Sequence, residues 1–305
     1  MILVEAPGLF TTVQDLGRMG FGPIGVSPSG AADAVALRVG NRLLGNPEGA
    51  AALEMTLAGG TFVFPEGALA ALAGSDFGAT MDEAGVAPCT PFRVPPGGRL
   101  CTGHTRSGAR CYLCVRGGIA VKPFLGSAST HVLSGLGGFE GRSLKKGDIL
   151  SIGNSAMTEP RPEGAVPHVL MPRKTLRVTD APQSDWFSEA AQSIFFNSGY
   201  RVTEEANRMG LRLEGPAIPA PAGGRMITEG VALGAVQIPA GGQPIILFVE
   251  QQTTGGYPKI ANVISADMSS VGQLRPRDEI RFERVDQATA RALLREQEEA
   301  IRAVH

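Results

Sequence analysis

One short stretch carries several groups that could take part in chemistry. Residues 251–259 read QQTTGGYPK and directly follow the apolar run PIILFVE, which is typical of a buried strand. Gly255 and Gly256 can expose successive backbone N–H groups that bind an anion, while Tyr257 adds a hydroxyl and Lys259 a positive charge. This combination suits a carboxylate, a carbonyl or a phosphate. A β-hairpin or bulge that uses the two glycines only to turn fits the same residues.

A second candidate ligand loop spans residues 11–33, TTVQDLGRMGFGPIGVSPSGAAD. Glycines there supply backbone freedom, and the side chains among them supply donors, acceptors and charge: Gln14, Asp15, Arg18, Ser29 and Asp33. An ordinary connection would not need so many polar groups, which favours a ligand loop. The alternative is a structural loop held in place by an ion pair between Asp15 and Arg18.

Two further stretches place polar side chains beside apolar strands. In EEANRMGLRLEGP, Asn207 and Arg208 precede an alternating strand, and the planar guanidinium of Arg208 could clamp a carboxylate or a phosphate. A lone arginine beside a turn is more often structural. In TEGVALGAVQIP, Glu229 precedes a glycine and Gln237 lies within an apolar strand, where its amide must find partners. This glutamine therefore either ties strands together or contacts a ligand.

Several familiar kinds of site have no counterpart in the sequence. Residues 126–142 are rich in glycine but contain neither GxxxxGK[ST] nor a GxGxxG that opens a helix, so they are a weak nucleotide motif. No spacing gives a Ser/His/Asp arrangement or a paired-carboxylate site, and the four histidines are scattered. Cys111 and Cys114 form a CxxC within an expected strand, where residues three apart point to opposite faces. We expect no protein-ligated metal and no disulfide.

Composition narrows the class of protein. The 305 residues are 43% hydrophobic, which is enough for a core without disulfides or metals. The 28 basic and 29 acidic side chains give a net charge of -1, which disfavours nucleic acid and anionic membranes as partners. No signal peptide and no apolar stretch of membrane-spanning length is recognisable, so we expect a cytoplasmic protein with reduced thiols.

The elements that must position these residues are expected to be mostly strands. The 41 glycines and 22 prolines exceed a fifth of the chain, which favours short strands joined by tight turns. Helical spacing indicates three helices. They are GAADAVALRVGNRLLG with Ser29 as its cap, SDWFSEAAQSIFF with Ser184 or Asp185 as its cap, and the C-terminal DQATARALLREQEEAIRAV, whose apolar face should dock on the body or on a partner.

A proline-rich segment divides the chain. Thr158–Lys174 contains four prolines, which is typical of a domain connection. On either side of it, VPPGGRL at residues 94–100 is echoed by IPAGGQP at 238–244, and KKGDILSI at 145–152 by RPRDEIRF at 275–282. Each echo pairs a turn with its neighbouring strand, as expected for two related β units that diverged by loop insertion.

Together these stretches resemble one known family. The segments that carry the resemblance are PGLFTTVQDLGRMGFGPIGVSPSGAAD, GNRLLGNPEGAAALEMTLAGG, YLCVRGGI, LGSAST, GRSLKKGD, NRMGLRLEGP, EGVALGAVQIPAGGQPI and QQTTGGYPKIANVISAD. They run from about Pro7 to Phe282 and are similar to the family of 5-oxoprolinase C subunits, also called the KipA or biotin-dependent carboxyltransferase family and formerly allophanate hydrolase subunit 2. The chain departs from the family at Met19, where proline is usual, and at Arg277, where glycine is usual.

The resemblance implies a fold as well as an activity. It implies two cyclophilin-like β-barrel domains, at residues 1–157 and 175–285, with a few short helices and a C-terminal helix over 286–305. It also implies two partners, a KipI-like B subunit and an A subunit, which together with this chain form an ATP-dependent 5-oxoprolinase that opens 5-oxo-L-proline to L-glutamate. The family's other branch is the carboxyltransferase part of urea carboxylase, where carboxybiotin on a carrier is the donor. A third interpretation is a non-catalytic regulatory partner of a kinase inhibitor.

The oxoprolinase interpretation assigns roles to the candidate residues. Coupling to ATP turns the oxygen of an unactivated lactam into a leaving group, and this step needs anion stabilisation and proton transfer. We expect Lys259, Arg208 and Arg18 to hold charge and Glu229 or Asp15 to move protons. The expected substrate-binding groups are Gln14, Arg18, Asn207, Gln237, Gln252, Thr254, Gly255, Gly256 and Tyr257. The chain has no lysine in an AMKM-like segment, so biotin would need a separate carrier.

Overall fold

The computed structural model describes residues 1–154, 170–221 and 226–304, and it divides the chain into two compact units. Unit 1 comprises Met1–Arg18, Ser29–Leu170 and Glu299–His305, and unit 2 comprises Met19–Pro28 and Met171–Glu298. The division near Leu170 falls within the proline-rich segment, most of which lies outside the described residues. No helix in the described part of the chain combines the length and the apolar character that crossing a membrane requires.

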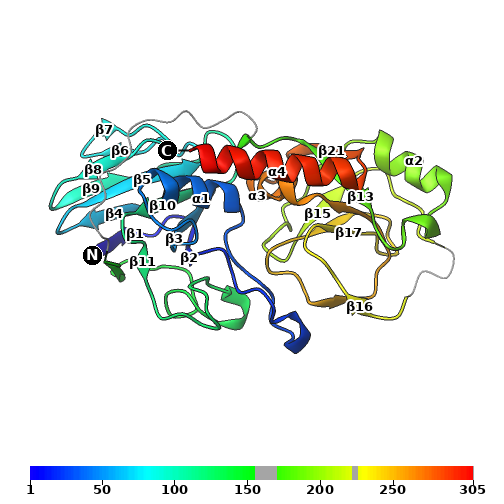
Figure 1. Ribbon diagram of the computed structural model, residues 1–305, viewed down its shortest axis with the longest axis horizontal. Coiled ribbons are helices and arrows are strands. Elements are labelled where there is room, and N and C mark those ends of the chain that lie inside the picture. The colour runs from blue at the N-terminus through cyan, green and yellow to red at the C-terminus, as the bar shows by residue number, and fades with distance from the viewer. Residues whose placement is uncertain (155–169, 222–225, 305) are drawn as a thin grey trace. The chain divides into compact units, whose positions relative to one another are not determined.

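The strands of unit 1 form two antiparallel sheets (Figure 1). The larger sheet has the order β11 (Ile119–Ala120), β12 (Ile149–Ile152), β1 (Ile2–Ala6), β4 (Thr61–Phe64), β9 (Gly98–Cys101), β6 (Thr80–Met81) and β7 (Ala84–Gly85). The smaller sheet has the order β2 (Phe10–Gln14), β3 (Ala52–Thr56), β10 (Arg110–Val115), β5 (Ala68–Gly74) and β8 (Phe92–Val94). A short 3-10 turn, η2 (Val132–Ser134), follows β11 in the chain. The expectation of a mostly β protein is confirmed.

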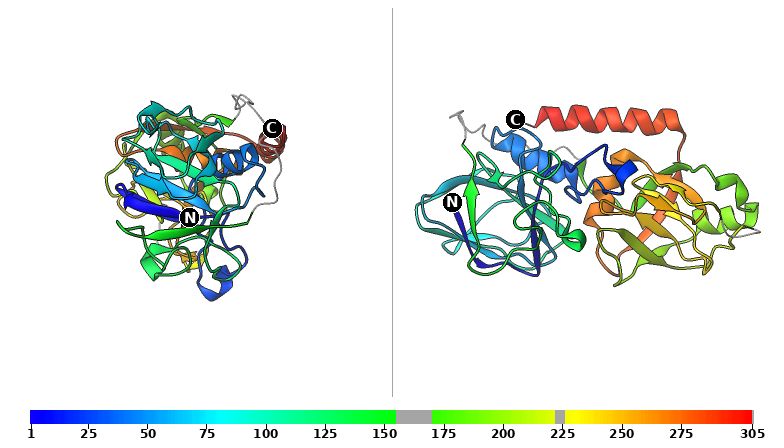
Figure 2. Two further views of the ribbon diagram at one scale, coloured as in Figure 1. Left: turned by 90° about the vertical axis from the view of Figure 1, so that its left-hand side faces the viewer. Right: turned by 90° about the horizontal axis from the view of Figure 1, so that it is seen from below.

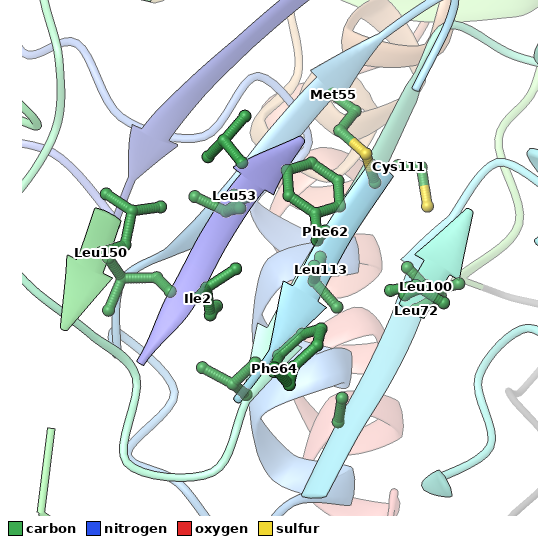
Figure 3. Close-up of a cluster of buried hydrophobic side chains, with 14 of the residues drawn as sticks. Ile2, Leu53, Met55, Phe62, Phe64, Leu72, Leu100, Cys111, Leu113 and Leu150 are labelled. Atoms are coloured by element: carbon green, nitrogen blue, oxygen red, sulfur yellow. The ribbon is translucent and has the colours of Figure 1, made fainter. Parts of the chain in front are cut away.

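The main core of unit 1 draws side chains from both sheets (Figure 3). Ile2 and Phe62 come from the larger sheet, and Leu53 and Leu113 from the smaller one, and all four are fully buried. All six residues of β10 are buried, because helix α1 (Ala34–Leu43) covers the other face of that sheet. Cys111 accordingly joins the core between the sheets and Cys114 the core beneath α1, as expected for a CxxC on a strand.

Helix α1 begins one turn later than its sequence suggested. Its N-cap is Asp33, whose carboxylate accepts a hydrogen bond from the backbone N–H of Ala36 at 2.9 Å. The prediction that Ser29 caps this helix is wrong, because the Ser29 hydroxyl donates to the carbonyl of Thr130. The helix packs closely on its sheet. A Cβ added to Gly40 would lie 2.6 Å from Cys114 Sγ, so this position requires glycine.

Unit 2 is built around a closed seven-stranded barrel (Figure 2). Its strands follow the order β13 (Thr175–Asp180), β20 (Lys259–Val263), β17 (Ala235–Gln237), β18 (Ile245–Leu247), β15 (Gly210–Glu214), β14 (Tyr200–Val202) and β21 (Glu279–Arg284). Neighbours are antiparallel except β13 and β21, whose parallel pairing closes the ring. A separate two-stranded ribbon pairs β16 (Glu229–Gly230) with β19 (Thr254–Gly255), and a 3-10 turn, η1, spans Gly22–Ile24. The resemblance had implied such a barrel.

The second expected helix is divided in two. A 3-10 turn, η4 (Ser184–Trp186), precedes helix α2 (Glu189–Asn197), and the N-cap is Ser188, whose hydroxyl accepts from the N–H of Ala191 at 3.2 Å. The prediction of Ser184 or Asp185 as the cap is therefore wrong, since Phe187 is in an extended conformation between the two elements. Unit 2 also contains η5 (Ser265–Asp267) and α3 (Met268–Gln273).

The expected C-terminal helix is confirmed as α4 (Gln287–Ala303), drawn in red in Figure 1. Its apolar face docks as predicted. The side chain of Gln297 is buried and donates to the carbonyl of Ala266 at 2.8 Å. Ile301 is fully buried in a cluster of unit 1 that includes Val35, Val39 and Leu43 of α1. The helix is thus held by its own apolar stripe.

The two sequence echoes share several hydrogen bonds, although the glycine with a left-handed backbone in the first echo is Gly97 in unit 1 and Gly242, one aligned position later, in unit 2. In the first, Gly98 N–H donates to the carbonyl of Pro95 and Gly242 N–H to that of Pro239, each at 2.8 Å. The second echo shares three hydrogen bonds. They are Lys145 N to Asp148 Oδ2, Gly147 N to Val4 O and Val4 N to Asp148 O in unit 1, and Arg275 N to Asp278 Oδ2, Arg277 N to Val202 O and Val202 N to Asp278 O in unit 2. This agreement supports two β units of common origin.

One difference between the echoes leads to a test of stability. Gly147 has a φ of 90° and Arg277, at the matching position, a φ of 73°, in the left-handed region that disfavours side chains. We expect Arg277→Gly to raise the free energy of unfolding by up to about 1 kcal/mol, because the ion pair it removes, to Glu204, is exposed. Chemical denaturation measures this change.

The control for this test is Gly147→Ala, where an added Cβ meets no atom within 4 Å. Any loss at this position is therefore conformational, and we expect about 1–2 kcal/mol. A destabilised Arg277→Gly protein would contradict the argument.

Candidate functional site

Unit 2 contains a buried lysine whose ammonium group meets a solvent-exposed carboxylate. Lys259 opens strand β20 and Glu229 opens strand β16, and Lys259 Nζ donates a hydrogen bond to Glu229 Oε1. The lysine side chain is only 4% exposed, whereas the glutamate side chain is 43% exposed. The barrel thus buries the aliphatic stem of Lys259 and presents its charge at an accessible carboxylate.

The strand register brings two more predicted residues to this lysine. Gln237 is the partner of Lys259 across β17 and β20, next to an irregularity in the pairing. Directly opposed residues of an antiparallel pair project from the same face, so the two side chains lie together. In the ribbon, Glu229 is the partner of Gly255, which places the glycine loop beside the carboxylate.

Glutamine side chains complete what we call the Lys259 cluster, defined as Gln183, Glu229, Gln237, Gln252 and Lys259. Gln183 Nε2 donates to Glu229 Oε1 at 3.1 Å, and Gln252 Nε2 donates to Gln237 Oε1 at 3.4 Å. Gln183 is 5% and Gln237 1% exposed. The remaining amide atoms, Gln183 Oε1 and Gln237 Nε2, are buried without a hydrogen-bond partner among the described residues. The cluster therefore holds one unmet acceptor and one unmet donor.

The glycine pair of the sequence 251–259 has two different surroundings. A Cβ on Gly255 would lie 2.7 Å from Gln237 Nε2 and 3.1 Å from Val231, so a larger residue here would have to displace the Gln237 side chain. Gly256 has more room, since its nearest neighbour would be Thr228 Oγ1 at 3.4 Å. Thr254 and Gly255 pair as strand β19, and the Tyr257 side chain is half-exposed. Gly255 therefore forms part of a β-hairpin, as the structural interpretation of this stretch expected, and it also lies beside the Lys259 cluster.

The cluster keeps its carboxylate ionised. The hydrogen bond from Lys259 lowers the pKa of Glu229, and the bond from Gln183 acts in the same direction against the opposing effect of burial. Because the folded-state pKa is depressed, the stability contributed by this pair is present above the unfolded-state pKa and is lost as the pH falls through the folded-state value. At neutral pH Glu229 is thus a carboxylate.

This electrostatic coupling can be measured directly. We expect the carboxyl carbon of Glu229, followed by NMR, to titrate below the ordinary range of a glutamate, and Lys259→Met to raise its pKa. Lys146→Met, at an exposed lysine in unit 1, should leave it unchanged. A Glu229 titration unaffected by Lys259→Met would mean that the hydrogen bond does not persist in solution.

In unit 1, Asp15 organises a neighbouring segment of the chain. Its Oδ1 accepts from the hydroxyls of Ser127 and Ser129, each at 2.6 Å, and from the N–H of Gly17 at 2.7 Å, while Oδ2 accepts from the N–H of Ala128 at 2.6 Å. Both carboxylate oxygens are therefore occupied by donors from the protein. This arrangement gives Asp15 a structural task, and the proton-transfer role that the sequence suggested stays a prediction.

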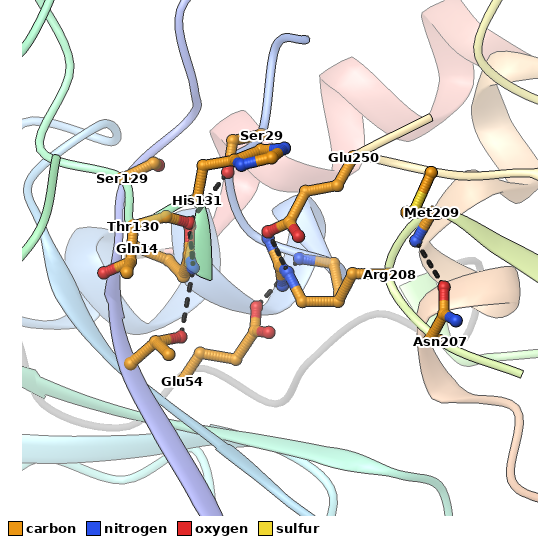
Figure 4. Close-up of polar contacts among 12 residues, drawn as sticks. Gln14, Ser29, Glu54, Ser129, Thr130, His131, Asn207, Arg208, Met209 and Glu250 are labelled. Carbon is orange, nitrogen blue, oxygen red and sulfur yellow. Dashed lines mark hydrogen bonds and ion pairs between the residues drawn. The ribbon is translucent and has the colours of Figure 1, made fainter. Parts of the chain in front are cut away.

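Arg18 and Gln14 bind the same part of unit 1. Arg18 is 2% exposed, donates to the carbonyl of Ser129 and lies 5.6 Å from the ring centre of Phe124. Gln14 Nε2 donates to the carbonyl of Thr130 at 3.1 Å, while Gln14 Oε1 is buried without a hydrogen-bond partner in the part of the chain described (Figure 4). The structural interpretation of this loop expected an ion pair between Asp15 and Arg18. In the structure, each of these residues instead binds the 124–129 segment.

A buried carboxylate beneath this loop was missed by the sequence reasoning. Glu54 is fully buried in β3, and its Oε2 accepts from the N–H of Ala32 at 2.8 Å and from the hydroxyl of Tyr112 at 2.7 Å. Arg110 Nε lies 3.7 Å from the other oxygen, and the Tyr112 hydroxyl accepts from the N–H of Asp33. Burial raises the pKa of Tyr112 well above its usual value. These hydrogen bonds hold the backbone at the start of α1. In the sequence, the only indication of this network was a glutamate within the apolar stretch AALEMT.

The arginine of the NRMG segment has a protein partner. Arg208 Nε and Glu250 Oε1 are 2.5 Å apart, and both residues are buried (Figure 4). The side-chain oxygen of the neighbouring Asn207 accepts from the N–H of Met209 at 2.8 Å, which forms an Asx-turn. These contacts agree with a structural arginine, and a clamp on substrate stays a prediction for Arg208.

The structure therefore separates the predicted residues into groups. Unit 2 brings Glu229, Gln237, Gln252, Gly255 and Lys259 together, and it adds Gln183, which was not predicted from the sequence. Unit 1 brings Gln14, Asp15 and Arg18 to the segment 124–130. No group of three or more metal-ligating side chains is found in the described ranges.

Comparison with known proteins identifies the family. Residues 24–284 match the family model described as carboxyltransferase domain, subdomain A and B. The chain belongs to this family. It is 40% identical over 276 residues to the C subunit of 5-oxoprolinase from Escherichia coli (strain K12), covering 90% of this chain and 88% of that protein. It is 36% identical to the C subunit of 5-oxoprolinase from Haemophilus influenzae, covering 94% of this chain and 92% of that protein.

The carboxyltransferase family also includes parts of much larger enzymes. The crystal structure of the Kluyveromyces lactis urea amidolyase matches all of this chain with a TM-score of 0.91 and 34% identity, over 20% of the length of that enzyme. The urea amidolyase of Saccharomyces cerevisiae is 33% identical, and the match covers 99% of this chain and 18% of that protein. The same fold thus occurs as a separate polypeptide and as one segment of a larger urea amidolyase.

Proposed function

We propose that this protein is the C subunit of an ATP-dependent 5-oxoprolinase, which opens 5-oxo-L-proline to L-glutamate together with its A and B subunits. The observation that carries the proposal is the 40% identity to the E. coli protein, since it extends over about nine tenths of both chains. The length of the match favours this function over urea carboxylation, where the matched region is a fifth of a larger enzyme.

The Lys259 cluster supplies groups that lactam opening requires. As water adds to the ring carbonyl carbon, negative charge develops on the carbonyl oxygen, and when the ring C–N bond then breaks the departing nitrogen takes up a proton. Lys259 Nζ is a buried positive charge that can stabilise such an oxygen, and the exposed Glu229 carboxylate can accept a proton from attacking water. Gln183, Gln237 and Gln252 are amides that can orient the ring.

The binding of ATP is assigned to the two partner proteins. A triphosphate requires several cationic or N–H donors, whereas the Lys259 cluster contains one ammonium that is already paired with a carboxylate. These residues do not fit a nucleotide triphosphate. ATP is thus a second substrate that activates the lactam, and a hetero-oligomer of this chain with an A subunit and a KipI-like B subunit is part of the proposal.

Reconstitution tests the proposed activity. The chain is purified with its A and B partners, and the formation of ADP and glutamate from 5-oxo-L-proline is measured. Coupled formation of both products that ceases when this chain is omitted is the expected result. A stable complex without turnover of 5-oxo-L-proline would overturn the proposal.

A carboxyltransferase function is the second candidate, and the TM-score of 0.91 to urea amidolyase favours it. The ureido ring of biotin and urea itself both carry an amide N–H beside a carbonyl, which the unmet amide atoms of the Lys259 cluster would suit. Here biotin, on a separate carrier, would bring the carboxyl group, and Gln183, Gln237 and Lys259 would hold its ring. The same reconstitution with urea and a biotinylated carrier distinguishes the two functions.

A further inference from the structure

We propose that Gln183 and Gln237 together form a recognition site for the edge of a cis amide, the arrangement in which an N–H and a C=O point to the same side. Gln183 Oε1 accepts from the amide N–H, and Gln237 Nε2 donates to the carbonyl oxygen. Gln183 becomes the specificity-determining residue, because it reads the one group that separates a cyclic amide from a cyclic ester. The proposal rests on the proposed function and names how its site selects the substrate.

The amide groups of Gln183 and Gln237 are both buried. Gln183 is 5% and Gln237 1% exposed, and each has one amide atom bonded within the Lys259 cluster and one atom buried without a partner among the described residues. Buried polar atoms are nearly always hydrogen-bonded, so two such atoms in a single cluster point to a missing ligand. The two atoms are of opposite kinds, one acceptor and one donor.

The orientation of Gln183 follows from its partner. An ionised carboxylate has no proton to donate, so Glu229 Oε1 acts only as an acceptor, and it lies 3.1 Å from the Gln183 amide nitrogen. The opposite end of that amide must then be its oxygen. Because Lys259 and Gln183 both donate to Glu229 Oε1, the carboxylate holds the Gln183 amide in place. The unmet atom is an acceptor, which requires an N–H from the ligand.

Gln237 is positioned from two sides. It is paired with Lys259 across the barrel strands, and its Oε1 accepts from Gln252 at 3.4 Å. Its Nε2 faces Gly255, where any side chain would come within 2.7 Å of the nitrogen. Gly255 therefore packs closely against Nε2, which is buried without a hydrogen-bond partner among the described residues. Since Gly255 is also the partner of Glu229, both unmet atoms belong to side chains around the same carboxylate.

This chemistry has three possible sources that share one edge: a lactam such as 5-oxo-L-proline, urea, and the ureido ring of biotin. All three present N–H and C=O side by side. The lactone analogue, 5-oxotetrahydrofuran-2-carboxylate, keeps the ring, the carbonyl and the carboxylate but has an oxygen in place of the N–H. The ring oxygen of the lactone would then face Gln183 Oε1, so two acceptors would meet without a proton between them. A site that binds an N–H strongly rejects such an analogue.

The test compares the lactam and the lactone on the full chain in its complex with the A and B subunits, with competition binding as the readout. Wild type should bind 5-oxo-L-proline at least about 10-fold more tightly than the lactone. Gln183→Met keeps the side-chain length and should reduce this ratio to within about 3-fold. Gln237→Met is the matched control, because both compounds have the carbonyl, and it should weaken both equally and keep the ratio.

Each result supports or overturns the assignment. If wild type does not discriminate between lactam and lactone, or if Gln183→Met weakens both to the same extent, Gln183 does not read the N–H. The wild-type comparison needs no variant, so a Gln183→Met protein that fails to fold leaves the test intact. A third result would be that 5-oxo-L-proline does not bind, whereas urea or biotin methyl ester binds wild type more tightly than the lactone does and loses this preference in Gln183→Met. In that case the edge site stands and the oxoprolinase function fails. Binding of none of the three overturns the site.

Discussion

Replacing Lys259 by methionine is expected to lower the turnover of 5-oxo-L-proline in the assembled enzyme by about 100-fold or more, while the protein stays folded. Removal of one preorganised group that stabilises developing negative charge typically has an effect of this size. The lysine side chain is 4% exposed, so its charge acts where water screens it little. Methionine is apolar and unbranched, so it can occupy the space of the buried aliphatic stem without a charge.

Two controls accompany the Lys259 variant. Lys146→Met removes an exposed lysine in unit 1 and should leave turnover unchanged. Thermal unfolding of Lys259→Met should resemble that of wild type, because the partner of the lysine is 43% exposed and can be solvated by water. Single-turnover measurements separate chemistry from binding. Full turnover in a folded Lys259→Met complex would remove the lysine from the mechanism.

Part of this site could be predicted from local sequence, because its signals lie within single segments. Gln237 stands out as an amide in an apolar strand, and Lys259 as a charge that follows two glycines. Their pairing across β17 and β20, which are not consecutive strands, appears only in the folded barrel. The predicted C-terminal helix was also found from local sequence, since its apolar stripe is a property of the helix itself.

The missed residues depend on partners that are distant in sequence. Gln183 lies 46 positions from Glu229, in a stretch, APQSDW, whose composition indicates only a turn. Glu54 lies 58 positions from Tyr112, and its role appears only when β3 and β10 are paired. The helix caps failed differently. Several residues near each helix start could serve as caps, and the choice of Asp33 and Ser188 was made by backbone conformation.

Replacing Asp15 by alanine is expected to lower the free energy of unfolding of unit 1 by about 2–4 kcal/mol, because four donors lose a charged acceptor at once. Hydrogen exchange should reveal where the loss occurs. The amides of Gly17 and Ala128, which donate to the carboxylate, should exchange faster than in wild type. Glu66→Ala is the control in unit 1, since this exposed carboxylate pairs with the N-terminus at 3.3 Å and should cost less than about 1 kcal/mol.

The Asp15 experiment separates two roles that the sequence could not distinguish. A proton-transfer residue must be free to gain and lose a proton, so its loss would lower turnover and leave stability nearly intact. A carboxylate that holds the segment 127–129 acts through its hydrogen bonds, so its loss should lower stability and expose that segment first. Asp15→Asn sharpens the contrast. The amide nitrogen of the new asparagine would face hydrogen-bond donors. If the role of Asp15 is structural, Asp15→Asn should therefore lower the free energy of unfolding about as much as Asp15→Ala. A stable Asp15→Asn protein with unchanged exchange at Ala128 would return the residue to the catalytic candidates.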